Sequence, residues 1–539
     1  MGRFLNKGNR KFAEFSKTKF FVDKTALINK LLEKDITEKF ICCSKARRFG
    51  KSVTADMLVA YFSKGVDSRK LFEPLCCVKD ELFLSNINRY DTIFIDIQAQ
   101  FEAAYERNEN PMTRIRTSVV NELQSEYPEI VSSDDIIADA LSKIYDQTDH
   151  QFVIIFDEWD YPVRELQEHK SELKKYIEFL RGLFKNSDAK EYIRLAYLTG
   201  IMPIIRTKGQ SAINNFTEYT MVHAGDLGTY IGFTEQEVLA LCRKSGSDFD
   251  QMKEWYDGYR LGQESMYNPL SVIKAITNHE FTQYWTATGT YEDISELINQ
   301  NFDGLRESVI QMLSGNRVTV RISDGKNDLH TFVNKNEVIT ALIHLGYFAY
   351  DKNTKEAYVP NKEIQEVFFH YMENNKNDSL SRFMNRSEQI LNSLLEKEEE
   401  QAAKLIQNIH NDFVSSISYN DENSLSCTIM IALISSFAYY HKPIREFPCG
   451  KGFADLVYLP LPSCPDLPVI VIELKWNQHA QTAIAQIKKR QYPESLTDFA
   501  GEILLVGINY DKRTKEHQCR IETHFAAAEN MENSTQRTE

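Results

Sequence analysis

The chain has 539 residues, of which 42% are hydrophobic and 26% charged, and its formal net charge is −14. A chain of this length exceeds what one hydrophobic core supports, so we expect about two to four domains of ordinary globular composition. The acidic balance argues against a surface covered with nucleic acid, but it leaves room for a local basic channel.

No apolar run approaches the roughly 18 residues that a membrane helix needs, and residues 1–7 lack the apolar core of a secretory signal. We therefore expect a cytoplasmic protein without a membrane partner. The nine cysteines include two adjacent pairs, Cys42-Cys43 and Cys76-Cys77, which do not have the spacing of a zinc site. They are expected to be small buried residues in a reducing compartment.

The first part of the chain alternates apolar, strand-like runs with helical stretches. Near-continuous apolar runs of this kind are typical of buried parallel strands. Strands separated by helices predict an α/β domain with a parallel sheet over residues 1–231. After an N-terminal arm and a helix at 24–32, the strands are expected at 39–43, 92–97, 152–156 and 192–198, and the helices at 51–62, 112–126 and 133–145.

A candidate phosphate-binding loop, Arg47-Arg48-Phe49-Gly50-Lys51-Ser52, lies between the first strand and the helix at 51–62. Backbone N–H groups at such a helix N-terminus bind phosphate oxygens. In this pattern Lys51 reaches the β- and γ-phosphates and the Ser52 hydroxyl binds Mg²⁺. Lys45 stands where the full pattern has its first glycine, so a basic turn without a ligand is the alternative. The residues predicted to bind nucleotide here are Arg48, Phe49, Gly50, Lys51 and Ser52.

The second half of a nucleotide site is predicted where Phe156-Asp157-Glu158 ends an apolar strand. Asp157 is placed to hold Mg²⁺, and Glu158 is placed to polarise the attacking water. Thr199, after the next strand, is placed to sense the γ-phosphate. Arg206 and Lys208 could supply charge to the transition state, in cis or across a subunit interface, or they could be surface cations. An acidic turn is the alternative for the strand end alone, but the presence of both elements in order favours a nucleotide site.

The pattern becomes helical from residue 232, and we predict a helical lid or connector over 232–410. The aromatic turn Trp255-Tyr256-Asp257-Gly258-Tyr259 and the pair Tyr439-Tyr440 are expected in the core or at its rim rather than stacked on bases. Residues 411–525 return to mixed α/β, and residues 526–539 are polar and expected to be disordered. In the α/β part, helices are expected at 422–440 and 481–492 and strands at 444–447, 453–458, 469–475 and 502–507, with a tight hairpin at Gly450–Gly452.

Two carboxylates and a lysine lie on two of these strands. The strand period of two puts Glu473 and Lys475 on one face, and Asp455 joins them if the two strands pair. Carboxylate oxygens are the ligands that Mg²⁺ prefers, so Asp455 and Glu473 are the predicted metal ligands. Lys475 would orient or deprotonate water and offset charge in the transition state of phosphodiester cleavage.

Several motifs together resemble the AAA-ATPase-like family of bacterial proteins, and the resemblance covers nearly the whole chain. This family commonly carries a PD-(D/E)xK nuclease-superfamily domain at its C-terminus, and the C-terminal segment here is similar to a restriction-endonuclease-like core. Trp159 departs from the family, which usually has Tyr there, and little effect is expected. The motifs are Arg47–Ser52, Phe156-Asp157-Glu158-Trp159-Asp160-Tyr161-Pro162, Leu198-Thr199-Gly200, Trp255–Tyr259 and Tyr267-Asn268-Pro269.

The resemblance implies ATP binding by a P-loop domain, and it implies that Gln486 is a supporting catalytic residue beside Asp455, Glu473 and Lys475. Glu422 and Glu446 are candidates for a further acidic ligand. The second helix of this segment would carry a basic patch suited to phosphates and end at a tyrosine, and two late histidines are expected at the surface. These residues are Lys488, Lys489, Arg490, Tyr492, His517 and His524.

The expected function is an ATP-binding and ATP-hydrolysing protein coupled to a Mg²⁺-dependent nuclease, with DNA favoured over RNA and defence or mobile-element biology as the context. A homo-oligomer through the ATPase domain is a further expectation. An Asp in a hairpin and a Glu-x-Lys on a strand are common patterns. The alternative is therefore a nucleotide-switched binding protein whose nuclease fold docks nucleic acid or protein without cleavage, and the net charge of −14 supports it. A third hypothesis is an ATPase fold without turnover.

Overall fold

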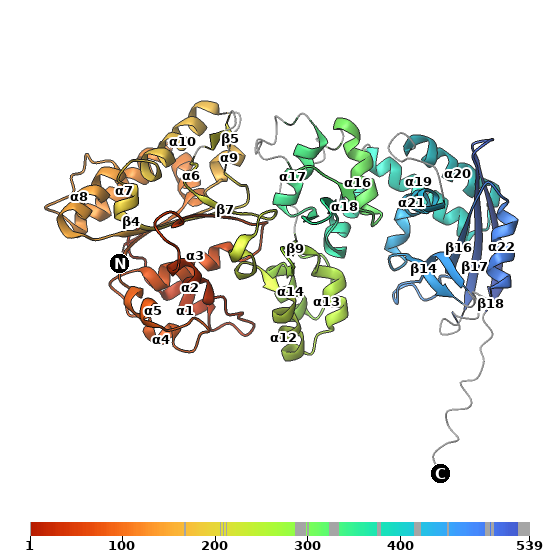
Figure 1. Ribbon diagram of the computed structural model, residues 1–539, viewed down its shortest axis with the longest axis horizontal. Coiled ribbons are helices and arrows are strands. Elements are labelled where there is room, and N and C mark those ends of the chain that lie inside the picture. Colours follow the sequence, from red (N-terminus) through yellow and green to blue (C-terminus); the bar gives the residue numbers. More distant parts are fainter. Residues whose placement is uncertain are drawn as a thin grey trace, which may run out of the picture. The chain divides into compact units, whose positions relative to one another are not determined.

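The computed structural model divides into two compact units (Figure 1). The first unit comprises Met1–Ile294 and Thr319–Val367, and the second comprises Ser295–Val318 and Phe368–Glu539. The finer division into 1–231, 232–410, 411–525 and 526–539 stays a prediction. The described residues are 2–166, 169–204, 206–207, 210–211, 213–285, 298, 301–322, 332, 334–374, 379–413, 422–449, 452–490, 496 and 501–525.

A five-stranded parallel sheet, ordered β2-β3-β4-β1-β7, forms the centre of the first unit. The predicted strands and the α/β parallel sheet are confirmed. Almost every residue of the first four strands is buried, because helices cover a sheet of this kind on both faces. The strands are β1 (Phe40–Ser44), β2 (Asp91–Asp96), β3 (Phe152–Asp157), β4 (Ile193–Gly200) and β7 (Thr217–Tyr219).

Helices connect these strands and bury their apolar faces against the sheet. Side chains cap three of them, since Asp80, Asp96 and Asn110 accept from the N–H groups of Phe83, Ala99 and Thr113. The elements around this sheet are α1 (Arg10–Phe15), α2 (Ala26–Leu32), α3 (Lys51–Phe62), α4 (Arg69–Phe72), α5 (Glu81–Asn86), α6 (Ile97–Glu106), α7 (Pro111–Glu126), α8 (Ile137–Thr148), α9 (Tyr161–Glu165), α10 (Lys170–Phe184), α11 (Ala189–Tyr192), the pair β5 (Arg206–Thr207) and β6 (Gln210–Ser211), and the 3₁₀ helix η1 (Gly225–Tyr230).

The helix predicted at 133–145 begins later, at Ile137. The Asp135 carboxylate accepts a hydrogen bond from the N–H of Ser132 and pairs with Lys143. These contacts form a turn that precedes the helix, so residues 133–136 do not take part in it.

Short strands interrupt the predicted helical region after residue 232. The sheet β8-β10-β9 and the hairpin β12–β13 were not predicted, because runs of two to four residues carry no clear periodicity. The elements are β8 (Phe233–Thr234), α12 (Glu235–Ser245), α13 (Phe249–Tyr256), β9 (Tyr259–Leu261), β10 (Glu264–Tyr267), α14 (Pro269–Asn278), η2 (Phe302–Gly304), α16 (Leu305–Leu313), β11 (Val318–Thr319), α17 (Lys335–Leu345), β12 (Ala349–Asp351), β13 (Glu356–Tyr358) and α18 (Lys362–Asn374).

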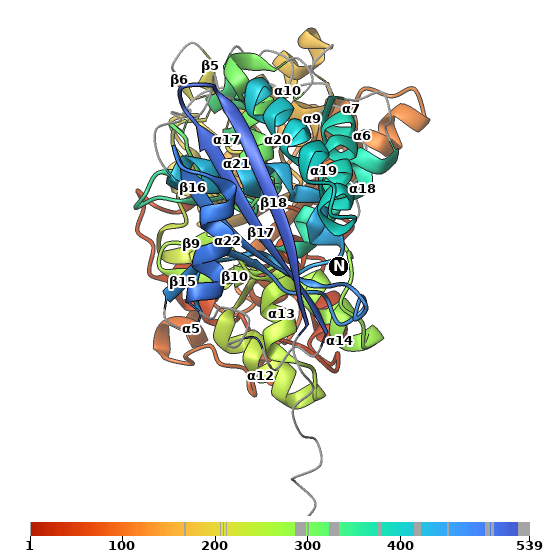
Figure 2. The same ribbon diagram turned by 90° about the vertical axis from the view of Figure 1, so that its right-hand side faces the viewer.

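A second five-stranded sheet, ordered β14-β15-β16-β17-β18, forms the centre of the second unit. Only β16 and β17 run parallel, and the helix α22 connects them. Figures 1 and 2 show α22 on one face of this sheet and α19–α21 on the other. The elements are α19 (Ser379–Leu395), α20 (Glu399–Phe413), α21 (Glu422–Ala432), η3 (Ile434–Ala438), β14 (Ile444–Cys449), β15 (Gly452–Tyr458), β16 (Val469–Trp476), α22 (Ala480–Lys489), β17 (Glu502–Asp511) and β18 (Glu516–Phe525).

The predicted order of elements in this unit agrees with the structure, with two corrections. The helix predicted at 422–440 ends at Ala432 and is followed by η3, because the Ser435 N–H donates to the Ser387 hydroxyl and leaves the α-helical pattern. The strand β18 was not predicted. The Gly450-Lys451 turn, Tyr492 and residues 526–539 lie outside the described residues. No helix in the described part of the chain is both long and apolar enough to cross a membrane.

Candidate functional site

The candidate phosphate-binding loop lies between β1 and α3, and two of its residues have a left-handed backbone. Gly50 precedes α3 with a φ of 90°, and Arg48 has a φ of 67°. Glycine adopts the left-handed conformation without strain, which favours it at position 50. Lys51 is buried and its Nζ donates to the Ala46 carbonyl at 3.0 Å, so the ammonium lies beneath the loop. Burial lowers the pKa of Lys51, and the nearby carboxylates oppose that shift.

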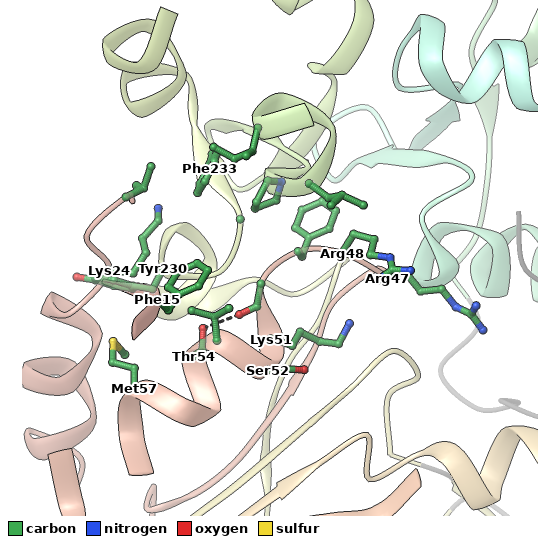
Figure 3. Close-up of a pocket in the computed structure, with 18 of the residues that line it drawn as sticks. Phe15, Lys24, Arg47, Arg48, Lys51, Ser52, Thr54, Met57, Tyr230 and Phe233 are labelled. Atoms are coloured by element: carbon green, nitrogen blue, oxygen red, sulfur yellow. Dashed lines mark hydrogen bonds between the residues drawn. The ribbon is translucent and has the colours of Figure 1, made fainter. Parts of the chain in front are cut away.

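This loop forms one wall of a cavity of about 850 Å³ in the first unit. Figure 3 shows the labelled side chains of Arg47, Arg48 and Lys51 at one end and those of Phe15 and Tyr230 at the other. The labelled Lys24 side chain lies beside the two aromatic rings, so cations lie at both ends of the cavity and the labelled rings at one of them. Further apolar side chains complete its wall, and they come from the N-terminal arm and from the segment after η1: Phe12, Phe20, Phe21, Phe233 and Ile273.

Four phenylalanines of the N-terminal arm line this cavity, which the sequence did not predict: Phe12, Phe15, Phe20 and Phe21. Residues 1–38 were expected as an arm and a helix, and no role in the site was predicted for them. The pairs Phe12–Phe21 and Phe15–Phe21 have centroids 6.1 Å and 5.9 Å apart, in edge contact. A local cluster of phenylalanines was the available signal, but such a cluster does not distinguish a ligand wall from a core.

The acidic end of β3 lies beside the loop. Burial raises the pKa of Asp157 to about 7, and a hydrogen bond with the Ser52 hydroxyl opposes that rise. Glu158 has a φ of 50° and its side chain lines the cavity together with Lys51. The structure thus brings the loop and the strand end together as the sequence order suggested.

Two residues that were predicted at the nucleotide site do not line the cavity. Among the described residues that line it, neither Asp157 nor Thr199 appears. Thr199 is fully buried at the end of β4, and its hydroxyl has no hydrogen-bond partner among the described residues. The Arg206 side chain and Lys208 lie outside the described residues.

Asp160 and Arg164 form an ionic cluster at this end of the cavity that was not predicted. The Asp160 carboxylate is fully buried and accepts hydrogen bonds from the N–H groups of Ile201 and Met202 at 3.1 and 2.8 Å. Arg164 donates from Nε to Asp160 at 3.1 Å and from Nη2 to Glu158 at 3.2 Å. The candidate base Glu158 is therefore ion-paired in this structure.

The predicted residues of the second site converge between β15, β16 and α22. The Asp455 carboxylate accepts from the N–H of Leu474 at 2.6 Å. Lys475 Nζ donates to Glu473 Oε1 at 2.9 Å, and Gln486 Nε2 donates to the same oxygen. Asp455, Glu473, Lys475 and Gln486 therefore form one cluster within the second unit.

The electrostatics of this cluster fit a divalent cation. Burial raises the pKa of Glu473 to about 7 and the charge of Asp455 adds to that rise. Burial also raises the pKa of Asp455, and the charges of Glu422 and Glu446 add to it. Glu473 Oε2 is buried without a hydrogen-bond partner among the described residues. Repelling carboxylates with an unsatisfied oxygen suit Mg²⁺, which accepts hard oxygen ligands.

The described residues contain no group of three or more His, Cys, Asp or Glu side chains arranged to hold a metal ion. A cation at Asp455 and Glu473 would therefore take its other ligands from water or substrate. Glu422 and Glu446 are exposed, and they influence Asp455 through charge.

The predicted basic patch on α22 is partly neutralised, because Lys488 pairs with Glu522. Arg490 lies near enough to Glu473 to lower its pKa. The surface position expected for His517 is wrong. This residue is buried on β18, and its Nδ1 lies 2.7 Å from the Gln407 side-chain oxygen. Burial lowers the pKa of His517 to about 3, so the ring is neutral at ordinary pH.

An uncharacterized protein from the vnfD 5′ region of Azotobacter chroococcum mcd 1 is 25% identical over 305 residues, covering 52% of this chain and 53% of that protein. The chain thus spans about half the length of this curated relative.

A solved structure, the ORC2 protein of Aeropyrum pernix in ADPNP–ADP complexes, aligns with 70% of this chain and 100% of its own at 11% identity and a TM-score of 0.28. A TM-score of this size does not establish a shared fold. The family model described as "Predicted AAA-ATPase" matches residues 7–208, the part that contains the phosphate loop and the acidic end of β3. Over these residues the chain is similar to predicted AAA-type ATPases.

Proposed function

We propose that the first unit binds and hydrolyses ATP with Mg²⁺. The observation that carries this proposal is a single cavity that is lined both by Lys51 and Glu158 and by aromatic side chains such as Phe15 and Tyr230. A triphosphate requires cations and the N–H groups of a helix N-terminus, and a purine base requires flat apolar contacts. The family match over residues 7–208 supports the same function.

Each predicted residue then has a role. Arg48, Phe49 and Gly50 shape the loop around the phosphates, and Lys51 exchanges its contact with the Ala46 carbonyl for phosphate oxygens. Ser52 and Asp157 would hold Mg²⁺, which when bound offsets charge on the β- and γ-phosphates. Glu158 would orient the attacking water, and Thr199 would sense the γ-phosphate.

Two substitutions test this function. Lys51→Ala should abolish ATP binding, because it removes a buried ammonium from the phosphate end. Glu158→Gln should keep ATP binding and lower phosphate release by about 100-fold or more, because the amide accepts no proton from water. Nucleotide titration and phosphate release measure the two effects. Hydrolysis at the wild-type rate in Glu158→Gln would show that Glu158 has another role.

We propose a second activity, metal-dependent cleavage of phosphodiester bonds in nucleic acid, for the cluster around Glu473 in the second unit. The unsatisfied Glu473 Oε2 beside Asp455 is the observation that favours it. Asp455 and Glu473 would hold Mg²⁺, Lys475 would orient water, and Gln486 would fix the Glu473 carboxylate. DNA is the expected substrate. The restriction-endonuclease-like assignment of this unit is part of the same proposal.

Cleavage of DNA and RNA by the purified full chain with Mg²⁺ and ATP tests this activity. Asp455→Ala and chelation by EDTA should each abolish cutting, whereas Glu516→Ala, at an exposed position of β18, should not. Cleavage that persists in Asp455→Ala would contradict the assignment of this cluster as the nuclease site. Lys51-dependent ATP binding without cleavage under any divalent metal would instead favour a nucleotide-switched binding protein.

A further inference from the structure

We propose that Arg164 is a catalytic residue that donates to the γ-phosphate of ATP, and that it leaves Glu158 when the nucleotide binds. The inference rests on the proposed ATP hydrolysis and adds to it a cation supplied in cis. Arg164 lines the same cavity as Lys51 and Glu158, and its side chain is only 7% exposed.

Of the three carboxylates that contact the guanidinium, Asp160 is the fully buried one. Asp160 holds Nε at 3.1 Å, and the chain itself holds Asp160 through the N–H groups of Ile201 and Met202. Glu165 lies 3.6 Å from Nη1 and its side chain is 52% exposed, so that contact is weak. Nη2 makes its bond to Glu158. Because the five donors of an arginine lie in one rigid plane, Nη2 leaves Glu158 only if the whole guanidinium tilts about its bond from Nε to Asp160.

The bond to Arg164 limits the chemistry that the Glu158 carboxylate can perform. A carboxylate that accepts from a guanidinium is less able to orient water and accept its proton. The γ-phosphate brings several anionic oxygens to the cavity end that Lys51 and Arg164 share, and they compete with Glu158 for Nη2. Nucleotide binding therefore frees Glu158 to act as the base and brings the Arg164 guanidinium to the γ-phosphate.

The reaction balances without another reactant. A water oxygen bonds to the γ-phosphorus, the bond from that phosphorus to the bridging oxygen breaks, and the bridging electron pair leaves with ADP. The proton of the water passes to Glu158. Arg164 only donates hydrogen bonds to charge that develops on the phosphoryl oxygens, as arginines supplied in cis do in other phosphoryl-transfer enzymes.

The test compares Arg164→Ala and Arg164→Lys with wild type. Arg164→Ala should lower kcat for ATP by about 100-fold or more, with a smaller change in KM. Its affinity for a non-hydrolysable ATP analogue should fall about tenfold, whereas its affinity for ADP should stay within about twofold, because ADP has no γ-phosphate. Arg164→Lys should recover part of kcat, since it keeps a cation but not the fork.

The matched control is Arg114→Ala, because Arg114 is a similarly buried arginine that pairs with Glu109 at 2.9 Å and does not line the cavity. It should leave the ratio of ATP-analogue to ADP affinity unchanged. Turnover near wild type in both Arg164 variants, or parallel loss of ATP-analogue and ADP affinity in a folded Arg164→Lys protein, would overturn the inference. Nucleotide binding that is insensitive to Lys51→Ala would instead overturn the proposed ATP site.

Discussion

Asp157 and Glu473 are buried carboxylates whose charge is incompletely balanced. Burial raises the pKa of each to about 7. In the folded protein they hold protons between about pH 4.5 and pH 7, where the same groups in the unfolded chain have lost them. The free energy of unfolding therefore falls as pH rises through this window, and each group's stabilising contribution is complete only below its unfolded pKa.

Glu473→Gln should weaken this pH dependence, because an amide does not ionise. The wild-type free energy of unfolding, measured in urea, should fall between about pH 5 and pH 7.5. In Glu473→Gln this fall should be smaller by about 1–3 kcal/mol. Glu522→Gln is the control, since a hydrogen bond from Lys488 lowers the pKa of Glu522. Replacing Glu522 should therefore not reduce the fall in the free energy of unfolding between these two pH values. An unchanged slope in Glu473→Gln would contradict the assigned shift.

The phosphate loop is an element held in shape by later segments of the first unit. The Asn268 side chain donates to the Arg47 carbonyl at 3.1 Å, and the rings of Phe49 and Tyr259 meet edge to face at 5.2 Å. Lys45, which replaces the first glycine of the full pattern, is fully buried and donates to the Thr220 carbonyl at 3.1 Å. These contacts explain how a loop with an incomplete pattern keeps its conformation.

The Asn268 side chain has two roles, and one substitution can remove one of them while it keeps the other. Its side-chain oxygen caps α14 by accepting from the N–H groups of Leu270 and Ser271, and its side-chain nitrogen holds the loop. Asn268→Asp should keep the cap but lose the loop contact, so nucleotide affinity should fall about tenfold at nearly unchanged thermal stability. Asn268→Ala should lose both, with a further cost of about 1 kcal/mol. A nucleotide affinity in Asn268→Asp equal to that of wild type would show that the contact between Asn268 and the Arg47 carbonyl does not support nucleotide binding.

The elements of both sheets could largely be predicted because their strands are continuous apolar runs bounded by polar turns. The end of α21 could not, since the apolar run 428–438 continues past it and a contact between Ser435 and Ser387 decides where the helix stops. The strand β18 buries alternate residues such as Cys519 and Ile521, a pattern with too few apolar members to recognise. The strand period predicted that Glu473 and Lys475 share a face, and Asp455 joins them because β15 pairs with β16. Gln486 was implied only by the resemblance, and Arg164 required the fold.

At the scale of the whole molecule, two proposed sites belong to separate units of one chain. If ATP controls cleavage, Lys51→Ala should lower nuclease activity of the full chain about tenfold or more although the Asp455 cluster is intact. Asp455→Ala should leave ATP hydrolysis unchanged, and it serves as the reciprocal control. Cleavage and phosphate release measured on the same preparations decide the matter. Equal cleavage by wild type and Lys51→Ala would show that the two activities are independent.

The first unit is discontinuous in sequence, because Thr319–Val367 returns to it after Ser295–Val318 has joined the second. Within the first unit, the Tyr259 hydroxyl donates to the Gly346 carbonyl, and a side chain at position 346 would collide with Ala46 in the phosphate loop. During synthesis on the ribosome, the surroundings of that loop therefore stay incomplete until the chain has been translated past Val367. A nascent chain released before that point would carry every residue of the phosphate loop without the packing that supports it.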